Sequence, residues 1–259
     1  MNVNVSSLSE CAFCQRKLYL RYVLNMTPEL TTAHARSLVG HALRKELSMR
    51  TTRLLKRMKD EQQLDALVRE EFAGVIADAP IIYREKLSGI PLGAFLPDVQ
   101  REMEPELELF SSRLRSLVRE HGADGALALV TPLKVEYAVS SATSGLSGII
   151  DKVMRPLAPV EIKTGRAGEG VWEGDRLQAC AYGMLLEEKF NQEVPYGFVE
   201  YAQIQEQRSV AFTERLRRRV VETRDDIREI LSGSLPDICP HGSGRKCDAC
   251  GLKEACYRL

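Results

Sequence analysis

The chain has 259 residues, of which 44% are hydrophobic and 28% are charged, and its 36 basic and 36 acidic side chains give no net charge. This composition supplies a core of ordinary size and excludes both a disordered tail and a miniprotein held by disulfides. No apolar run approaches the roughly 18 residues of a membrane span, and the N-terminus lacks the features of a signal peptide. We therefore expect a soluble, cytoplasmic protein with no membrane partner.

The charges are spread unevenly along the chain. Residues 1–60 carry a net charge of +7 and residues 207–259 carry +3, whereas residues 61–124 carry −6 and residues 125–206 carry −4. A polyanion such as DNA would find a cationic surface at the two ends if they meet in space. The simpler interpretation is that these runs are solvated helix faces, and the charge pattern alone favours it.

Helical patterns fill the first half of the chain. Helices are predicted over residues 7–23, 34–59, 61–78 and 98–120, with a loop at 88–93 that contains glycine and proline. Ser7-Leu8-Ser9-Glu10 has the form of a capping box for the first of these helices. We find no internal repeat, and a shift in composition near residue 125 is the one sign of a boundary.

Beyond residue 125 the pattern alternates with period two. Strands are predicted over residues 134–139, 146–154, 160–163, 196–202 and 208–212, and helices over 173–189 and 213–232. Helices followed by strands and further helices indicate an α+β protein, with a central mixed sheet flanked by helices.

Charged residues interrupt two of these strands. Asp151 follows Gly148-Ile149-Ile150, and Glu161 and Lys163 flank Ile162, so that period two places Glu161 and Lys163 on one face. A hairpin could bring Asp151 alongside them. Two adjacent anions resist burial unless a cation lies between them, and oxygen ligands favour Mg2+ or Mn2+. The alternative is an exposed edge hairpin that carries ordinary charges.

Other polar residues follow these strands or precede them. Gln178 and Tyr182 are four residues apart in the predicted helix 173–189 and share one face. His41 follows Gly40 in a basic helix, where a single histidine is more often an ordinary surface or core residue than a ligand.

Cysteines are concentrated at the C-terminus. The seven are Cys11, Cys14, Cys180, Cys239, Cys247, Cys250 and Cys256. An odd count in a cytoplasmic chain argues against disulfides, and the Cys-x2-Cys pair suits metal ligation. One ligand set is local, with Cys239 and the last three cysteines around zinc. The other combines the last three with a cysteine near the N-terminus and suits an iron–sulfur cluster. Cys180 fits a small buried hydrophobe.

Together these residues resemble the RecB-like branch of the PD-(D/E)XK nuclease superfamily. The matching motifs are Gly148-x2-Asp151, Glu161-Ile162-Lys163, Gln178-x3-Tyr182 and His41. The chain most resembles the CRISPR-associated RecB-like nucleases (the Cas-four exonucleases), in which one cysteine precedes a basic helix and three close the chain. Cys14-Gln15-Arg16-Lys17 and Cys247-x2-Cys250-x5-Cys256 follow that layout, whereas Cys11 fits it less well.

The resemblance implies a fold, two cofactors and a substrate. It implies a RecB-like core in which an iron–sulfur lobe joins the termini, with a [4Fe–4S] cluster on Cys14, Cys247, Cys250 and Cys256. It implies a Mg2+ or Mn2+ ion held by His41, Asp151, Glu161 and the Ile162 carbonyl, with Asp98 as a further candidate. Lys163, Gln178 and Tyr182 would complete the catalytic set. The implied activity is exonucleolytic cleavage of DNA at single-stranded ends, which trims spacer precursors before the CRISPR integrase complex acts.

Four segments follow from these assignments. They are residues 1–60 with the first cluster cysteine and the histidine, a helical insertion at 61–125, the nuclease core at 126–235, and the cluster segment at 236–259. The insertion and Cys239 depart from the family pattern. Two other functions remain open: a repair or recombination nuclease of the same superfamily, and a non-catalytic nucleic-acid-binding module with structural zinc.

Overall fold

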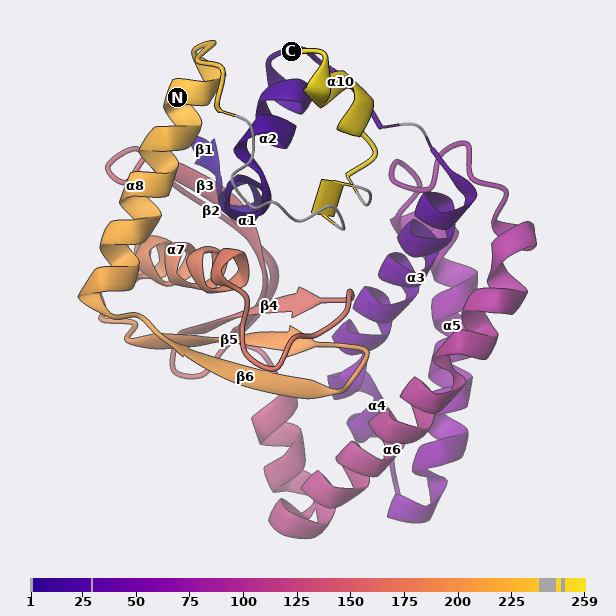
Figure 1. The fold of residues 1–259 in the computed structure, drawn as a ribbon. Coiled ribbons are helices and arrows are strands. Elements are labelled where there is room, and N and C mark those ends of the chain that lie inside the picture. Colours follow the sequence, from indigo (N-terminus) through magenta and orange to yellow (C-terminus); the bar gives the residue numbers. More distant parts are fainter. Residues whose placement is uncertain (1, 29, 238–245, 248–249) are drawn as a thin grey trace.

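The protein consists of a mixed β-sheet covered by helices and a neighbouring lobe made of helices, as Figure 1 shows for the computed structural model. The structure describes residues 2–28, 30–237, 246–247 and 250–259. Within this part of the chain, no helix is both long enough and apolar enough to cross a membrane.

Six strands form the sheet. They are β1 (Val3–Asn4), β2 (Lys134–Ser141), β3 (Leu146–Met154), β4 (Ala158–Lys163), β5 (Tyr196–Tyr201) and β6 (Glu206–Ala211). Their order is β1-β3-β4-β5-β6, with β2 paired to β3, and the β1–β3 and β4–β5 pairs are parallel while the others are antiparallel. The predicted mixed sheet flanked by helices is therefore confirmed. Strand β1 escaped prediction because two residues are too few to show a period.

Three helices cover this sheet. Helix α7 (Glu173–Phe190) packs on the strands, and α1 (Val5–Phe13) and α8 (Glu214–Leu231) pack against α7. The helix approaches closely at Gly148, where a Cβ atom would lie 2.9 Å from the Tyr182 ring and 3.2 Å from the Val5 side chain. A glycine at this position therefore allows Tyr182 to reach the strand that carries Asp151.

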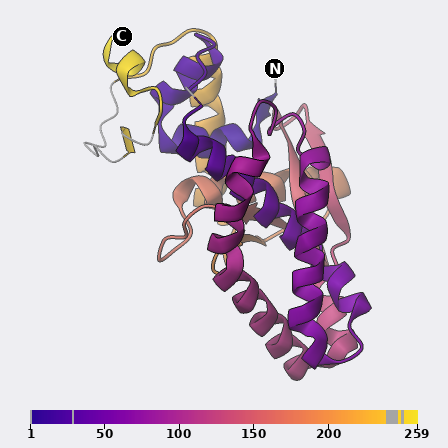
Figure 2. The same ribbon diagram turned by 90° about the vertical axis from the view of Figure 1, so that its right-hand side faces the viewer.

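The second lobe has its own hydrophobic core. It contains α3 (Thr32–Met49), α4 (Thr51–Arg57), a short 3-10 helix (Glu61–Gln63), α5 (Leu64–Ile82) and α6 (Leu92–Val130). Buried aliphatic and aromatic side chains such as Leu43, Val68 and Phe110 fill it, separately from the core under the sheet. Figure 2 shows these helices extending away from the sheet.

Ion pairs link the helices of this lobe. Arg44 binds Glu106 through two hydrogen bonds of 2.7 and 2.8 Å, and Arg50 binds Asp78 at 2.6 Å. Further pairs are Arg36–Glu102, Arg57–Glu70, Arg57–Glu71, Arg69–Glu104, Arg115–Asp65 and Arg119–Glu61. Five arginines of α3, α4 and the turn between them, Arg36, Arg44, Arg50, Arg53 and Arg57, are thus paired with acids of residues 61–124.

The first predicted helix differs from the structure in two ways. Helix α1 begins at Val5, and the Asn4 side chain accepts a hydrogen bond from the Ser6 amide at 3.0 Å. The predicted capping box is therefore wrong, because the helix starts directly after strand β1. The helix also stops at Cys14, whose backbone is extended, and α2 (Gln15–Tyr22) follows. This break turns the Cys14 position toward the C-terminal segment.

The two ends of the chain meet beside α2. The buried Arg16 donates hydrogen bonds to the Pro236 carbonyl at 2.9 Å and to the Cys256 carbonyl at 2.8 Å. Helix α10 (Lys253–Tyr257) lies against α2, close to the C-terminus in Figure 1. A guanidinium with several donors suits this task, because it can satisfy two backbone carbonyls at once.

Candidate functional site

Two carboxylates lie side by side on neighbouring strands. The register pairs Lys152 with Val160 and Val153 with Pro159, and one further step places Asp151 opposite Glu161. Both side chains are buried. Asp151 Oδ2 accepts a hydrogen bond of 2.7 Å from the Ile162 amide, which fixes its orientation. The structure therefore brings together the two acids that sequence reasoning singled out.

A third acid, Glu136, continues the line of Asp151 and Glu161 across the strands, and we call these three residues the acidic row. Sequence reasoning did not single out Glu136. Strand β2 pairs Val135 with Lys152 and Tyr137 with Ile150, so Glu136 faces Asp151. Its backbone has a φ of 46°, a conformation that non-glycine residues seldom adopt and that is often found at functional sites. Glu136 lies in a predicted strand, but ordinary exposed strand residues are also charged, so no signal in the sequence distinguishes it from them.

Lys45 of helix α3 reaches these acids from the helical lobe. Its Nζ lies 2.7 Å from Asp151 Oδ1 and 2.9 Å from Glu136 Oε1. Burial works to lower the pKa of Lys45, but the two carboxylates outweigh it and raise the pKa. The ammonium thus acts as a cation between two strand acids, in the position where their combined charge attracts one.

Lys163 lies at the other side of Glu161. Its Nζ is 3.2 Å from Glu161 Oε1, 3.2 Å from Asp175 Oδ1 and 2.7 Å from Gln178 Oε1. Burial works to lower the pKa of Lys163, but the charges of Glu161 and Asp175 outweigh it and raise the pKa, so the amine stays protonated. Asp175, in the first turn of α7, was also missed; it is held by a 3.1 Å hydrogen bond from the Tyr201 hydroxyl.

Helix α7 supplies a chain of hydrogen bonds behind Lys163. Gln178 accepts from Lys163 and lies 3.4 Å, Nε2 to oxygen, from the Tyr182 hydroxyl. That hydroxyl donates to the Ile149 carbonyl at 2.9 Å. The one-turn spacing of Gln178 and Tyr182 therefore ties Lys163 to strand β3, two residues before Asp151.

His41 lies one helical turn before Lys45 on α3. Its Nδ1 is 2.6 Å from the Thr164 hydroxyl, next to Lys163 in sequence. Burial, followed by the charges of Lys86, Lys45 and Lys163, lowers the pKa of His41 to about 4. The ring is therefore neutral at pH 7, the state in which imidazole binds metals. Asp98, by contrast, is exposed on α6 and pairs with Arg101 at 3.3 Å.

The donor chemistry fits a hard divalent cation. Burial and the nearby Asp151 charge raise the pKa of Glu161, which shows how strongly two adjacent anions need a counter-charge here. Within the described residues, no three His, Cys, Asp or Glu side chains converge closely enough to hold a metal alone. Mg2+ commonly takes only one or two carboxylates and completes its shell with water and substrate phosphate. The Asp151–Glu161 pair meets that requirement.

Four cysteines line one small cavity between the chain ends. Cys14 precedes α2, Cys247 and Cys250 lie in the C-terminal segment, and Cys256 lies in α10. Lys17, Lys246 and Lys253 line the same cavity. The three lysines could stabilise thiolates by their charge, but among the described residues no three of these thiols converge closely enough to hold a metal.

The other three cysteines differ in their surroundings. Cys11 is buried outside this cavity, and burial followed by the charge of Asp226 raises its pKa to about 11. Cys180 is fully buried in the core under the sheet, in keeping with its predicted packing role. Cys239 lies outside the described residues, so the local zinc set that includes it is not tested.

Comparison with known proteins agrees with this arrangement. Residues 2–257 match the family model described as PD-(D/E)XK nuclease superfamily, so the match spans the sheet, the helical lobe and the cysteine segment. No curated protein matches the chain.

Proposed function

Because the chain belongs to the PD-(D/E)XK nuclease superfamily, whose members are metal-dependent nucleases acting on nucleic acid, we propose that it is a Mg2+- or Mn2+-dependent deoxyribonuclease that trims single-stranded DNA ends. The observation that carries the proposal is the position of Lys163 between Glu161 and Asp175, on the strand next to Asp151. Three buried carboxylates around one ammonium, with the pKa values of Glu161 and Lys163 shifted by burial and by nearby charges, are an arrangement that clusters at functional sites.

Each residue of this group has a role in the proposed reaction. Asp151 and Glu161, with the Ile162 carbonyl, would hold the divalent cation, and His41 would join them as the resemblance implies, although these three side chains do not converge in the structure. When bound, the cation polarises a phosphate oxygen and lowers the pKa of a water molecule. Lys163 stabilises the charge that develops on the phosphate. Gln178 and Tyr182 keep the Lys163 ammonium in place.

A metal-dependent assay on end-labelled DNA tests this activity. The wild-type protein should degrade single strands from an end in Mg2+ or Mn2+, and chelation of the metal should stop the reaction. Glu161→Ala should be inactive under the same conditions. Equal degradation by the wild type and this variant would disprove the assignment, because it would show a contaminating nuclease or a different site.

The cysteine cavity supports a second part of the proposal, a [4Fe–4S] cluster on Cys14, Cys247, Cys250 and Cys256. These four residues line one cavity although more than 200 residues separate the first from the others. Cluster ligation by four thiolates would fasten the two ends of the chain beside α2.

Anaerobic purification tests the cluster. The protein should be brown and contain iron and sulfide, and Cys14→Ala should lose both and unfold at a lower temperature. Cys11→Ala is the matched control, because Cys11 lies three residues away but outside the cavity. Stoichiometric zinc without iron would show that the cysteines hold zinc and not an iron–sulfur cluster. Loss of the colour in Cys239→Ala but not in Cys14→Ala would show that Cys239 is the fourth ligand in place of Cys14.

We further propose that the physiological substrate is a spacer precursor in the cytoplasm, trimmed before integration into a CRISPR array. The motifs around Cys14 and the three C-terminal cysteines support this role, since they follow the layout of the Cas-four exonucleases. Co-purification with a CRISPR integrase tests it. If the protein does not bind the integrase but degrades recombination intermediates, a role as a repair nuclease would replace the proposed role in CRISPR adaptation.

A further inference from the structure

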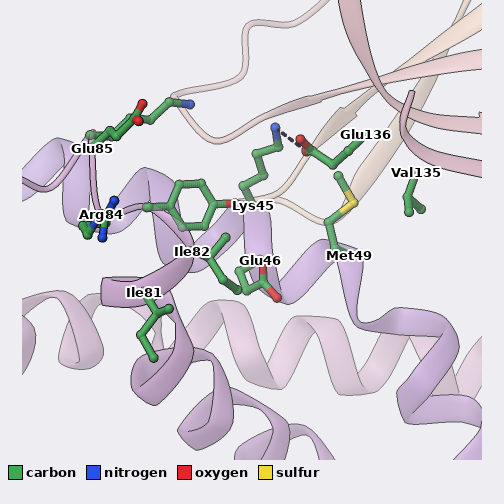
Figure 3. Close-up of a pocket in the computed structure, with 11 residues that line it drawn as sticks. Lys45, Glu46, Met49, Ile81, Ile82, Arg84, Glu85, Val135 and Glu136 are labelled. Atoms are coloured by element: carbon green, nitrogen blue, oxygen red, sulfur yellow. Dashed lines mark ion pairs between the residues drawn. The ribbon is translucent and has the colours of Figure 1, made fainter. Parts of the chain in front are cut away.

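An open hollow of about 530 Å³ lies beside the acidic row, between the helical lobe and the edge of the sheet (Figure 3). Helix α3 contributes Lys45 and Met49 to it, the end of α5 contributes Ile81 and Ile82, and strand β2 contributes Val135. Its size falls within the range of small-molecule sites, roughly 300–1,000 Å³.

The aliphatic side chains in this hollow are exceptionally exposed. Ile81 retains 76% of its accessible surface, Ile82 retains 55% and Val135 retains 53%. Exposed aliphatic side chains that gather around a concave surface indicate a ligand rather than a folding requirement. The two isoleucines come from one lobe and the valine from the other, so the ligand would contact both.

The charges around the hollow favour a polyanion. Lys45, Arg84 and Lys86 line it together with three glutamates. Glu46 is occupied by Arg50 at 3.1 Å, and Glu136 by Lys45. Among the described residues, Arg84, Lys86 and Glu85 take part in no ion pair, so two cations and one anion remain around the hollow, a small excess of positive charge for an incoming phosphate. Lys86 lies over the Tyr83 ring, 5.8 Å from its centroid.

The hollow is continuous with the acidic row. Lys45 both lines the hollow and binds Asp151 and Glu136. Lys86 lines this hollow and also the neighbouring one beside His41 and Thr164. A ligand in the hollow would therefore lie next to the carboxylates, with cationic side chains on both sides of it.

We propose that this hollow binds the unpaired bases of the DNA strand whose backbone lies across Asp151 and Glu161. The proposal rests on the nuclease function proposed above and adds the origin of its preference for single strands. Aliphatic side chains bury the face of any base without regard to sequence, while Lys86 and Arg84 hold the flanking phosphates. A base within a duplex cannot enter, because its faces are stacked and its edge is paired.

Binding to an intact and an abasic single strand tests the proposal. The full-length protein is titrated with labelled strands in Ca2+, and one strand lacks bases at three successive positions from its end. Loss of the bases should weaken wild-type binding about tenfold or more, which corresponds to about 1.4 kcal/mol, because the aliphatic surface of the hollow then stays in contact with water. The double variant Ile81→Ser/Ile82→Ser should bind the intact strand about as weakly as the wild type binds the abasic strand. For this variant, removal of the bases should weaken binding little further.

Two further variants keep the test decisive. Val135→Ser, on the opposite wall, should repeat the loss if the isoleucine variant folds poorly. Leu129→Ser removes an equally exposed aliphatic side chain, with 52% of its surface accessible, from α6 outside the hollow, and should leave binding unchanged.

The outcomes separate this inference from the nuclease proposal. Unchanged binding by the isoleucine and valine variants, or equal losses for intact and abasic strands, would overturn the base-binding role even when Glu161→Ala abolishes cleavage. Equal losses for duplex and single-stranded DNA would also overturn it, since they would point to backbone contacts. If the wild type fails to cleave any DNA, the nuclease proposal fails instead.

Discussion

The helical lobe and the sheet organise their charged residues in opposite ways. Between α3, α5 and α6, most arginines meet an anion of a neighbouring helix, as Arg44 meets Glu106 and Arg50 meets Asp78. On the sheet, Glu136, Asp151 and Glu161 form a row of like charges, and the lysines that contact them come from α3 and from β4 itself. Opposite charges that cancel stabilise packing, whereas gathered like charges demand an external partner.

This difference changes the meaning of the charge pattern in the sequence. The sequence left open whether the basic N-terminal segment forms a cationic face for a polyanion or solvated helix faces, and the structure shows its arginines in α3 and α4 largely paired with acids of α5 and α6. A run of like charges in a sequence can therefore indicate a helix that packs against an oppositely charged helix. Cations that line hollows, such as Lys86 and Arg166 beside His41, are better candidates for phosphate contacts.

Removal of one acid from the row should have the largest effect. We expect Asp151→Ala and Glu161→Ala to abolish cleavage in Mg2+ or Mn2+ yet to leave DNA binding nearly intact, because they remove metal affinity but no cationic surface. Cleavage and binding in Ca2+ should be measured on the same strands. Cleavage at the wild-type rate by both variants would reduce the row to ordinary hairpin charges.

Lys163→Ala should lower the saturated cleavage rate by about 100-fold or more, which is usual when one electrostatic group at the reacting centre is removed. Lys163→Arg should rescue poorly, because a planar guanidinium cannot replace a compact ammonium between Glu161, Asp175 and Gln178. Single-turnover cleavage at saturating enzyme separates rate from binding.

The matched control for this prediction is Lys152→Ala. Lys152 is also a buried strand lysine, but it pairs with Glu200, 2.9 Å away, and not with the acidic row. The Lys152→Ala variant should be less stable than the wild type, but its saturated cleavage rate should lie within a few fold of the wild-type rate. A rate that is unchanged in Lys163→Ala would instead assign Lys163 to substrate binding.

Much of the sheet region could be predicted from the sequence. Period-two alternation defined β3 at Leu146–Met154, and it placed Glu161 and Lys163 on one face of β4. The one-turn spacing of Gln178 and Tyr182 likewise predicted a shared face, and in the structure one hydrogen bond joins them. These predictions work because they need only the local period of one element.

Residues that depend on tertiary register could not be predicted. Glu136 and Lys45 meet at Asp151 because β2 pairs with β3 in one register and α3 docks across that edge. Asp175 resembles any acid in the first turn of a helix until Lys163 and Tyr201 are seen beside it. Single-residue patterns carry no information about such contacts between distant segments.

In the helical lobe, stability should respond more than catalysis. Glu71 is buried and pairs with Arg50, Arg53 and Arg57, so Glu71→Ala removes the anion at the centre of a buried charge network. Arg50 keeps Glu46 and Asp78, and Arg57 keeps Glu70. We expect the free energy of unfolding to fall by about 3 kcal/mol, measured by urea denaturation. The saturated cleavage rate of the folded protein should not change.

Glu70→Ala is the control for that prediction, because Glu70 is the preceding residue and pairs with Arg57 at the surface. An exposed pair contributes at most about 1 kcal/mol, so the loss should be much smaller than for Glu71. Equal losses for both variants would show that helix propensity, and not the buried network, determines the effect.

The smallest expected effect concerns an ion pair that ties α7 to α8. Glu187 accepts hydrogen bonds of 2.8 Å from Arg217 Nη2 and from the Val194 amide. Burial works to raise the pKa of Glu187, but these partners outweigh it and lower the pKa below its usual 4.5. A carboxyl with a lowered pKa in the folded state stabilises the protein above the unfolded-state pKa, and this stabilisation disappears as the pH falls through the folded-state pKa.

Glu187→Gln should therefore lower the free energy of unfolding by about 1 kcal/mol at pH 7, a value kept small because the pair is partly exposed. The difference from the wild type should shrink when urea denaturation is repeated below pH 4.5, since the wild-type carboxyl is then protonated as well. Glu188→Gln is the neighbouring control, since Glu188 is exposed and, within the part of the chain that the structure describes, accepts a side-chain hydrogen bond from the Ser141 hydroxyl alone. It should change stability by less than about 0.5 kcal/mol. A Glu187→Gln difference that stays constant from pH 7 to pH 3 would mean that the side chain contributes by its shape and not by its charge.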